Sequence, residues 1–178
     1  MKKILFLCLL ICSGVKAQGL EQLKLSNALI VAQQDKAEDR FTMEVNLAEI
    51  FANSGIKTMA SLNFLKEGSE MTSLAKDSLQ QLIKSKGVDT YVLVSVRGYD
   101  RRFKEAEMHG DLKTELSVGH LYPVYREGIA SITFEFLFFR DGAFVAYDQL
   151  KLGGIGSRES VLKKLRRKLP KRIKKKWK

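Results

Sequence analysis

The side chains best suited to binding or chemistry lie in one irregular stretch, residues 100–130, and just before it. The densest part is residues 119–128, where imidazole, phenol and guanidinium groups follow one another closely. Further basic and aromatic side chains stand at the end of the strand that is predicted directly before this stretch. Ligands of open sheets bind beyond the carboxyl ends of parallel strands, so both groups could line one polar cleft. The candidate ligand-binding or partner-binding residues are therefore Arg97, Tyr99, Arg101, Arg102, His120, Tyr122, Tyr125 and Arg126.

Two other interpretations of the same stretch remain open. In the first, Tyr122 and Tyr125 only pack the loop against the domain while Arg126 and Glu127 are solvated, because most loops connect elements rather than bind ligands. In the second, residues 119–128 supply the active site of a small hydrolase or transferase. The sequence has no Gly-x-Ser-x-Gly elbow, and a histidine without an orienting partner makes no serine triad. No catalytic residue is therefore assigned.

Metal and cofactor sites are not expected. His109 and His120 show no His-x-x-x-His spacing and have no cysteine ligands to join them. Residues 153–157 precede the last helix as a phosphate loop would, but they lack the Gly-Lys-Ser/Thr ending and the third glycine of a dinucleotide fingerprint. They are better explained as a flexible joint, although Arg158 could hold an anion weakly at the start of that helix.

Positive charge is concentrated at the carboxyl end. The formal net charge of the whole chain is +11, and residues 158–178 carry twelve lysines or arginines against the single acid Glu159. An amphipathic helix with such a basic face can lie on an anionic membrane surface. The alternatives are that its apolar row covers the sheet, which is favoured as far as Leu169, and that the last residues are merely solvated. The candidate residues for anionic-surface binding are Lys171, Arg172, Lys174, Lys175, Lys176 and Lys178.

Residues 1–17 have the features of a secretory signal peptide. A basic start precedes an unbroken apolar run, residues 4–11, and small side chains precede a cleavage site after Ala17. Lipidation at Cys12 is the alternative, which is disfavoured because Ile11 occupies the position of a small residue in lipoprotein signals. We therefore expect a periplasmic or secreted protein whose mature chain has no cysteine. No later run approaches the ~20 apolar residues that span a membrane, and export argues against nucleic acid as the partner.

One domain, residues 18–157, and a basic carboxyl-terminal helix and tail, residues 158–178, are expected to follow. The fold class is α+β, with a mixed sheet of β-α-β-α-β order followed by an antiparallel β-hairpin and a carboxyl-terminal helix. Residues 91–96 are apolar on both faces, which predicts a strand in the middle of the sheet. Residues 116–121 could form a short strand or turn, and Pro170 is expected to kink or end the last helix after Leu169. The periodicity indicates strand 28–32, helix 39–52, strand 56–64, helix 71–82, strand 91–96 and hairpin 131–152.

The hairpin has two possible turns around Asp141-Gly142. A two-residue loop would pair Phe139 with Phe144 and set Glu135 opposite Asp148, which places like charges side by side. A three-residue loop with a bulge at Gly142 avoids that contact and is the favoured prediction.

The order of elements from Ala28 to Leu169 resembles the α/β domains of periplasmic envelope-assembly proteins, such as the TolB amino-terminal domain and the curli-secretion lipoprotein family. The step Gly87-Val88-Asp89-Thr90-Tyr91-Val92-Leu93 into the central strand is part of this resemblance. It includes no specific motif, so it transfers no functional residue, and the signal lacks a good lipobox. The resemblance implies a non-catalytic binding or assembly role in the cell envelope, with an envelope protein or an anionic membrane surface as partner. A small periplasmic hydrolase or transferase using residues 119–128 is the alternative function.

Overall fold

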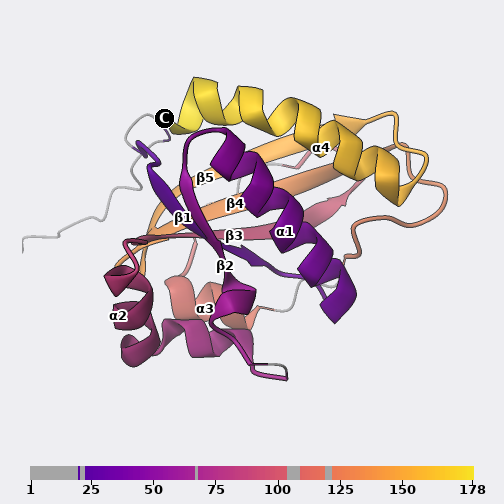
Figure 1. Cartoon of the computed structure of the whole chain (residues 1–178). Coiled ribbons are helices and arrows are strands. Elements are labelled where there is room, and N and C mark those ends of the chain that lie inside the picture. The colour runs from indigo at the N-terminus through magenta and orange to yellow at the C-terminus, as the bar shows by residue number, and fades with distance from the viewer. Residues whose placement is uncertain (1–19, 21–22, 67, 104–108, 119–121) are drawn as a thin grey trace, which may run out of the picture.

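The computed structural model describes residue 20 and residues 23–66, 68–103, 109–118 and 122–178 (Figure 1). The predicted signal peptide, both cysteines and His120 lie outside the described residues. The described chain forms one five-stranded sheet in the order β2-β1-β3-β4-β5. β1, β2 and β3 are parallel, whereas β4 and β5 run antiparallel to their neighbours, which confirms the predicted α+β class. The strands are β1 (Asn27–Ala32), β2 (Lys57–Ala60), β3 (Thr90–Tyr99), β4 (Ser131–Arg140) and β5 (Ala143–Gly153).

Helices cover both faces of this sheet (Figure 1). α1 (Ala37–Asn53) and α4 (Arg158–Arg172) lie on one face, while α2 (Asp77–Ser85) and α3 (Leu112–Ser117) lie on the other. The chain moves from β1 to β2 in one direction and then passes back across β1 to β3. Because parallel crossovers are right-handed, these two opposite moves place α1 and α2 on opposite faces. β3 is therefore covered on both sides, as the sequence predicts, and Tyr91 to Val96 are all buried.

Three predicted elements have different bounds in the structure. The helix expected at 71–82 is divided at Lys76, whose extended backbone separates a 3-10 helix, Met71–Ala75, from α2. The strand expected at 56–64 ends at Ala60 and is followed by a 3-10 helix, Ser61–Asn63. Part of the irregular stretch is helical rather than strand or turn, because the Asp111 side chain accepts a hydrogen bond from the Thr114 backbone N–H at 2.8 Å and starts α3.

The β4–β5 hairpin has a two-residue loop, so the favoured three-residue loop is wrong. Asp141 and Gly142 both have positive φ, +48° and +77°, as a type I′ turn requires. Phe139 pairs with Phe144, and the register then shifts between Phe138 and Phe139. This bulge sets Glu135 opposite Gln149 instead of Asp148. The like-charge contact is avoided, but by a bulge within the strand rather than by a longer loop.

The last helix does not end at Pro170. α4 continues to Arg172, and a π-helical turn, Ile173–Trp177, follows it. Interior proline costs a helix roughly 3 kcal/mol, whereas burial of each large apolar side chain contributes about 1.5–3 kcal/mol. The wider π-helical turn lets a four-residue spacing stay on the buried side, where a straight α-helix would rotate it away. The side chains with 0% exposure in this row are Val161, Leu165, Leu169, Ile173 and Trp177.

Candidate functional site

The structure brings three of the predicted binding residues together beside the end of β3. The Tyr122 ring meets the Tyr99 ring edge to face, with 5.6 Å between the centroids. The Arg126 guanidinium lies 4.6 Å from the centroid of the Tyr99 ring, and the Tyr99 hydroxyl donates a hydrogen bond to the Pro123 carbonyl. Burial raises the pKa of Tyr99 to about 12, so this phenol stays neutral at physiological pH.

The other predicted binding residues lie apart from this cluster. Tyr125 donates a hydrogen bond from its hydroxyl to the Gly156 carbonyl at 3.0 Å, which ties the loop to the β5–α4 joint. Arg101 lies over the Phe103 ring, 5.0 Å from its centroid, and Arg102 is exposed. Arg97 faces the opposite side of the sheet. The sheet itself therefore divides the predicted cleft, and His120 lies outside the described residues.

Arg97 lies instead beside a buried carboxylate on the α2/α3 face. Its Nε is 3.8 Å from Glu135 Oε1, and Glu135 is only 3% exposed. Loss of hydration raises the pKa of Glu135, and Arg97 opposes that shift only in part. Among the described residues, Glu135 Oε1 has no hydrogen-bond partner, and neither has Nε2 of Gln149, which stands directly opposite on β5. This cluster is an electrostatically strained part of the core.

The carboxyl ends of β1 and β2, where ligands of parallel sheets usually bind, are filled by the side chain of Glu44. Glu44 is fully buried on α1. Its carboxylate accepts hydrogen bonds from the Ala32 N–H at 3.1 Å, the Ser61 hydroxyl at 2.6 Å and the Leu62 N–H at 3.1 Å. Arg40 adds an ion pair at 3.3 Å. The Glu44 oxygens are thus bound by two backbone N–H groups and by the Ser61 and Arg40 side chains of the same chain, so this carboxylate has a structural role.

α4 and the π-helical turn lie along one border of the molecule (Figure 1). Their outer side carries exposed lysines and arginines that form a basic ridge. Most of its cations recur at spacings of three or four residues, which places them on the side opposite the buried apolar row. Lys178 also donates to the Ser54 carbonyl, at 2.9 Å, and remains exposed. We define the basic ridge by its exposed cations, Lys163, Arg166, Arg167, Lys171, Lys174, Lys175, Lys176 and Lys178.

Arg172, which was grouped with these lysines in the sequence, does not belong to the ridge. Its guanidinium holds both carboxylate oxygens of Asp148, which is 3% exposed. Trp177 donates a hydrogen bond from Nε1 to the same carboxylate at 2.8 Å. Ile173 and Trp177 are buried and anchor the backbone of the last residues, so only the lysine side chains are solvated. Their binding to an anionic surface stays a prediction.

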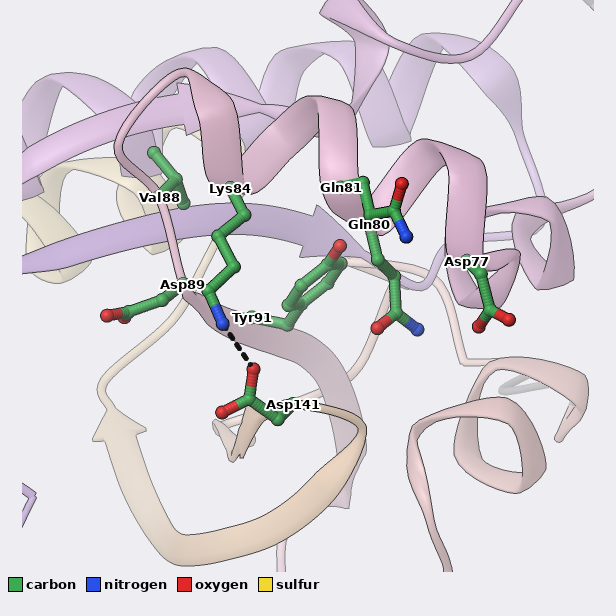
Figure 2. A pocket seen from close by; sticks show the side chains of 8 residues that line it. All are labelled: Asp77, Gln80, Gln81, Lys84, Val88, Asp89, Tyr91 and Asp141. Atoms are coloured by element: carbon green, nitrogen blue, oxygen red, sulfur yellow. Dashed lines mark hydrogen bonds and ion pairs between the residues drawn. The ribbon is translucent and has the colours of Figure 1, made fainter.

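A small pocket lies at the other end of the sheet, between α2 and the β4–β5 turn (Figure 2). Its cavity volume is about 210 Å³. Lys84 bridges its mouth through an ion pair of 2.9 Å between its Nζ and Asp141 Oδ1. We call this cavity the α2 pocket, and the residues that line it are Asp77, Gln80, Gln81, Lys84, Val88, Asp89, Tyr91 and Asp141.

The floor of the α2 pocket contains a buried phenol. Tyr91 is 3% exposed, and burial raises its pKa to about 12. Figure 2 shows its hydroxyl directed toward α2, between Lys84 and Gln80. That hydroxyl has no hydrogen-bond partner among the described residues. A buried polar group without a partner costs roughly 1–3 kcal/mol, which makes Tyr91 unusual in an otherwise well-packed strand.

Sequence reasoning missed the α2 pocket because its parts look ordinary when they are read separately. The sequence pattern predicts Tyr91 as a core residue of the central strand and Asp141 as a turn residue. The antiparallel return of β4 brings the turn beside the start of β3, which the local pattern does not reveal. One usable signal was the row Asp77, Gln80, Gln81 and Lys84, which places only polar groups on one side of a helix.

Within the described part of the chain, no group of three or more His, Cys, Asp or Glu side chains is arranged to hold a metal ion. The helices among those same residues are all too short or too polar to cross a bilayer.

Comparison with known proteins gives weak structural likenesses and no family. No family model and no curated protein matches the sequence. The lipoprotein GNA1162 from Neisseria meningitidis is similar at 11% identity and a TM-score of 0.46, over 86% of this chain and 99% of that one. The PelC dodecamer from Paraburkholderia phytofirmans is similar in two crystal forms, at 12% identity and TM-scores of 0.42 and 0.41, over 82% of this chain and 86% of that one. At these values the likenesses carry no further meaning, so any function must be argued from the residues of this chain.

Proposed function

We propose that this chain is an exported, non-catalytic binding module of the cell envelope that adheres to an anionic membrane surface through the basic ridge. Export is supported by the signal-like residues 1–17. Adhesion is supported by the concentration of lysines and arginines on one exposed side of α4 and of the turn that follows it. Each cation close to an anionic surface contributes about 1 kcal/mol.

The packing of α4 determines the kind of adhesion. An amphipathic helix that inserts into a membrane needs a free apolar side. In this protein, Leu165, Leu169 and Trp177 on that side are fully buried against the sheet. Contact with the membrane is therefore electrostatic and peripheral, and it weakens steeply as salt screens the charges. The single observation behind this proposal is the pairing of a buried apolar side with an exposed cationic side on one rigid helix.

Vesicle sedimentation tests the proposal directly. The mature chain is mixed with phosphatidylcholine vesicles that contain or lack phosphatidylglycerol, at low and high salt. We expect binding only to the anionic vesicles and only at low salt. Lys171→Glu, Lys174→Glu and Lys175→Glu together should weaken binding by at least about tenfold, because three favourable contacts of about 1 kcal/mol each are lost.

The matched control reverses the charge of three exposed lysines elsewhere, by Lys66→Glu, Lys86→Glu and Lys113→Glu. It changes the net charge by the same amount but leaves the basic ridge intact. Binding like that of the unmodified chain is expected from this control. Equal loss in both triple variants would show that only net charge matters, and equal binding to neutral vesicles would exclude the electrostatic mode.

A further inference from the structure

The α2 pocket has an excess of negative charge around a hydrogen-bonding floor. Asp77, Asp89 and Asp141 line it, and Lys84 is the one cation among the described residues of its lining. The pKa of Lys84 is raised, first by its hydrogen bond to Asp141 and further by the charge of Asp89. The ammonium group of Lys84 is therefore stabilised by both carboxylates. A positive ligand would therefore be attracted to the mouth, whereas an anion would be repelled.

The floor of the pocket offers an acceptor in the right place. The Tyr91 hydroxyl is buried, lines the cavity and has no hydrogen-bond partner among the described residues. Gln80 also lines the pocket from α2, and its amide nitrogen donates a hydrogen bond to the Ala75 carbonyl at 3.2 Å, which leaves its amide oxygen as an acceptor. A group with several N–H donors could bind the phenol oxygen and the amide oxygen below while it meets the carboxylates above.

We propose that the α2 pocket binds an organic cation, namely the ammonium or guanidinium group of an amine or of a basic side chain. The structure already seats one such group at the mouth, since Lys84 Nζ lies 2.9 Å from Asp141 Oδ1. Both partners of that ion pair are largely exposed, at 65% and 76% of their side chains. An exposed pair of this kind is easily broken, so Lys84 can move out and leave Asp141 to the ligand.

The volume limits the size of the ligand. About 210 Å³ accommodates one aminoalkyl or guanidinoalkyl group but not a drug-sized molecule. The pocket therefore has room for a single cationic end group of a ligand. This inference is independent of the basic ridge, which lies along α4 on the other face of the sheet, so either proposal can fail without the other.

The test is a titration of the isotope-labelled mature chain with cadaverine, followed by amide chemical shifts. We expect the shifts to concentrate at Gln80, Lys84 and Tyr91. The diol 1,5-pentanediol has the same length without charge and should produce none of them. Shifts spread evenly over the acidic surface, or equal shifts with the diol, would overturn the proposal.

Three variants make the test specific. Asp89→Asn with Asp141→Asn should weaken cadaverine binding, by about two- to fivefold for each exposed carboxylate removed. Lys84→Gln should strengthen it, because the internal competitor for Asp141 is gone. If these residues had only a structural role, the two variants would not change the affinity for cadaverine in opposite directions. An affinity that is unchanged both in Lys84→Gln and in the Asp89→Asn, Asp141→Asn double variant would contradict the proposal.

Tyr91→Phe separates the floor from the mouth. It keeps the ring and removes only the hydroxyl, so the fold should be retained and the binding constant should fall. Cadaverine shifts that persist at full strength would show that the pocket holds only water at its floor and would overturn the role of Tyr91. A peptide Gly-Gly-Lys-Gly-Gly run beside cadaverine distinguishes the two sources of the cation. Tighter binding of the peptide indicates a basic protein segment, and tighter binding of cadaverine indicates a free amine.

Discussion

Trp177, the penultimate residue of the chain, donates a hydrogen bond from its indole Nε1 to Asp148 Oδ2 at 2.8 Å, and both side chains are buried. The indole also packs against Phe51, Phe136 and Phe138, with ring centroids 5.0–5.7 Å apart. Its backbone carbonyl accepts a hydrogen bond from the Leu25 N–H. The end of the chain is thus part of the core, and it joins α1, β4, β5 and the segment before β1.

Trp177→Ala should therefore destabilise the whole domain. Removal of a large buried aromatic side chain costs about 3–5 kcal/mol, and the Asp148 carboxylate loses one of its donors. Urea unfolding measures the free energy of unfolding, with Lys176→Ala as the control, because the neighbouring lysine is exposed and its loss should stay within about 0.5 kcal/mol. Similar unfolding midpoints for the two variants would show that the tail is dispensable.

The sequence predicts those parts of the fold that depend on local periodicity. β3, α1 and the two strands of the hairpin follow from the spacing of apolar residues, and the crossover rule makes the first three strands parallel. The order β2-β1-β3 does not follow from the sequence. The face of the sheet on which Asp148 lies could not be predicted from the sequence. The bulge near Val145 turns Asp148 toward the core, and no local pattern predicts a bulge. The π-helical turn could not be predicted from the sequence either, because it depends on the packing of Trp177 into the core.

The candidate sites differ in the same way. Tyr99, Tyr122 and Arg126 could be grouped because loops at the end of one strand must lie near each other. Arg97 was grouped with them wrongly in space. Arg97 and Tyr99 stand two residues apart and would share a face of a regular strand, but the bulge between Val96 and Gly98 places them on opposite faces. The α2 pocket depends on a contact between Lys84 and Asp141, which are distant in sequence, and only the tertiary structure brings them together.

Glu135 makes the stability of the domain depend on pH. Its pKa is raised above the ordinary value of 4.5, chiefly by burial. Between the ordinary pKa and the raised one, the native state binds more protons than the unfolded state, so stability falls as pH rises through that window. Above the window the buried charge destabilises the domain fully, and below it the cost is absent.

Glu135→Gln should therefore raise the melting temperature at neutral pH and leave it nearly unchanged in acid. Calorimetric scans of both proteins across that pH range check this. Because Arg97 would then lose its partner, Arg97→Gln with Glu135→Gln is the matched variant. A melting temperature that falls on Glu135→Gln at neutral pH would mean that the Arg97 ion pair outweighs the cost of burial.

Gly98 allows Phe103 to fold back over the end of β3. Gly98 has φ +150° at the bulge in this strand, and an added Cβ would collide with the Phe103 ring. Gly98→Ala should therefore destabilise the domain by more than the roughly 0.5–1 kcal/mol of an ordinary glycine effect. In the Phe103→Ala background the same change should cost less, because the collision is gone and only the backbone strain remains. Equal costs in both backgrounds, measured by urea unfolding, would contradict the contact.

The contact between Arg126 and Tyr99 distinguishes a structural role from a binding role for the cluster of Tyr99, Tyr122 and Arg126. A cation above an aromatic ring at a partly exposed site contributes about 0.5–1 kcal/mol. A double-mutant cycle with Arg126→Ala and Tyr99→Leu should return a coupling energy of that size in urea unfolding. Arg126→Ala also removes the charge that lowers the pKa of Tyr99, so spectrophotometric titration should find the phenol deprotonating at still higher pH. If the coupling energy is near zero while the titration is unchanged, Arg126 is not held by Tyr99 and is available to a partner. A full coupling energy instead assigns Arg126 to holding the loop in place, and it would leave Tyr122, which is 43% exposed, as the side chain of this cluster that can still meet a ligand.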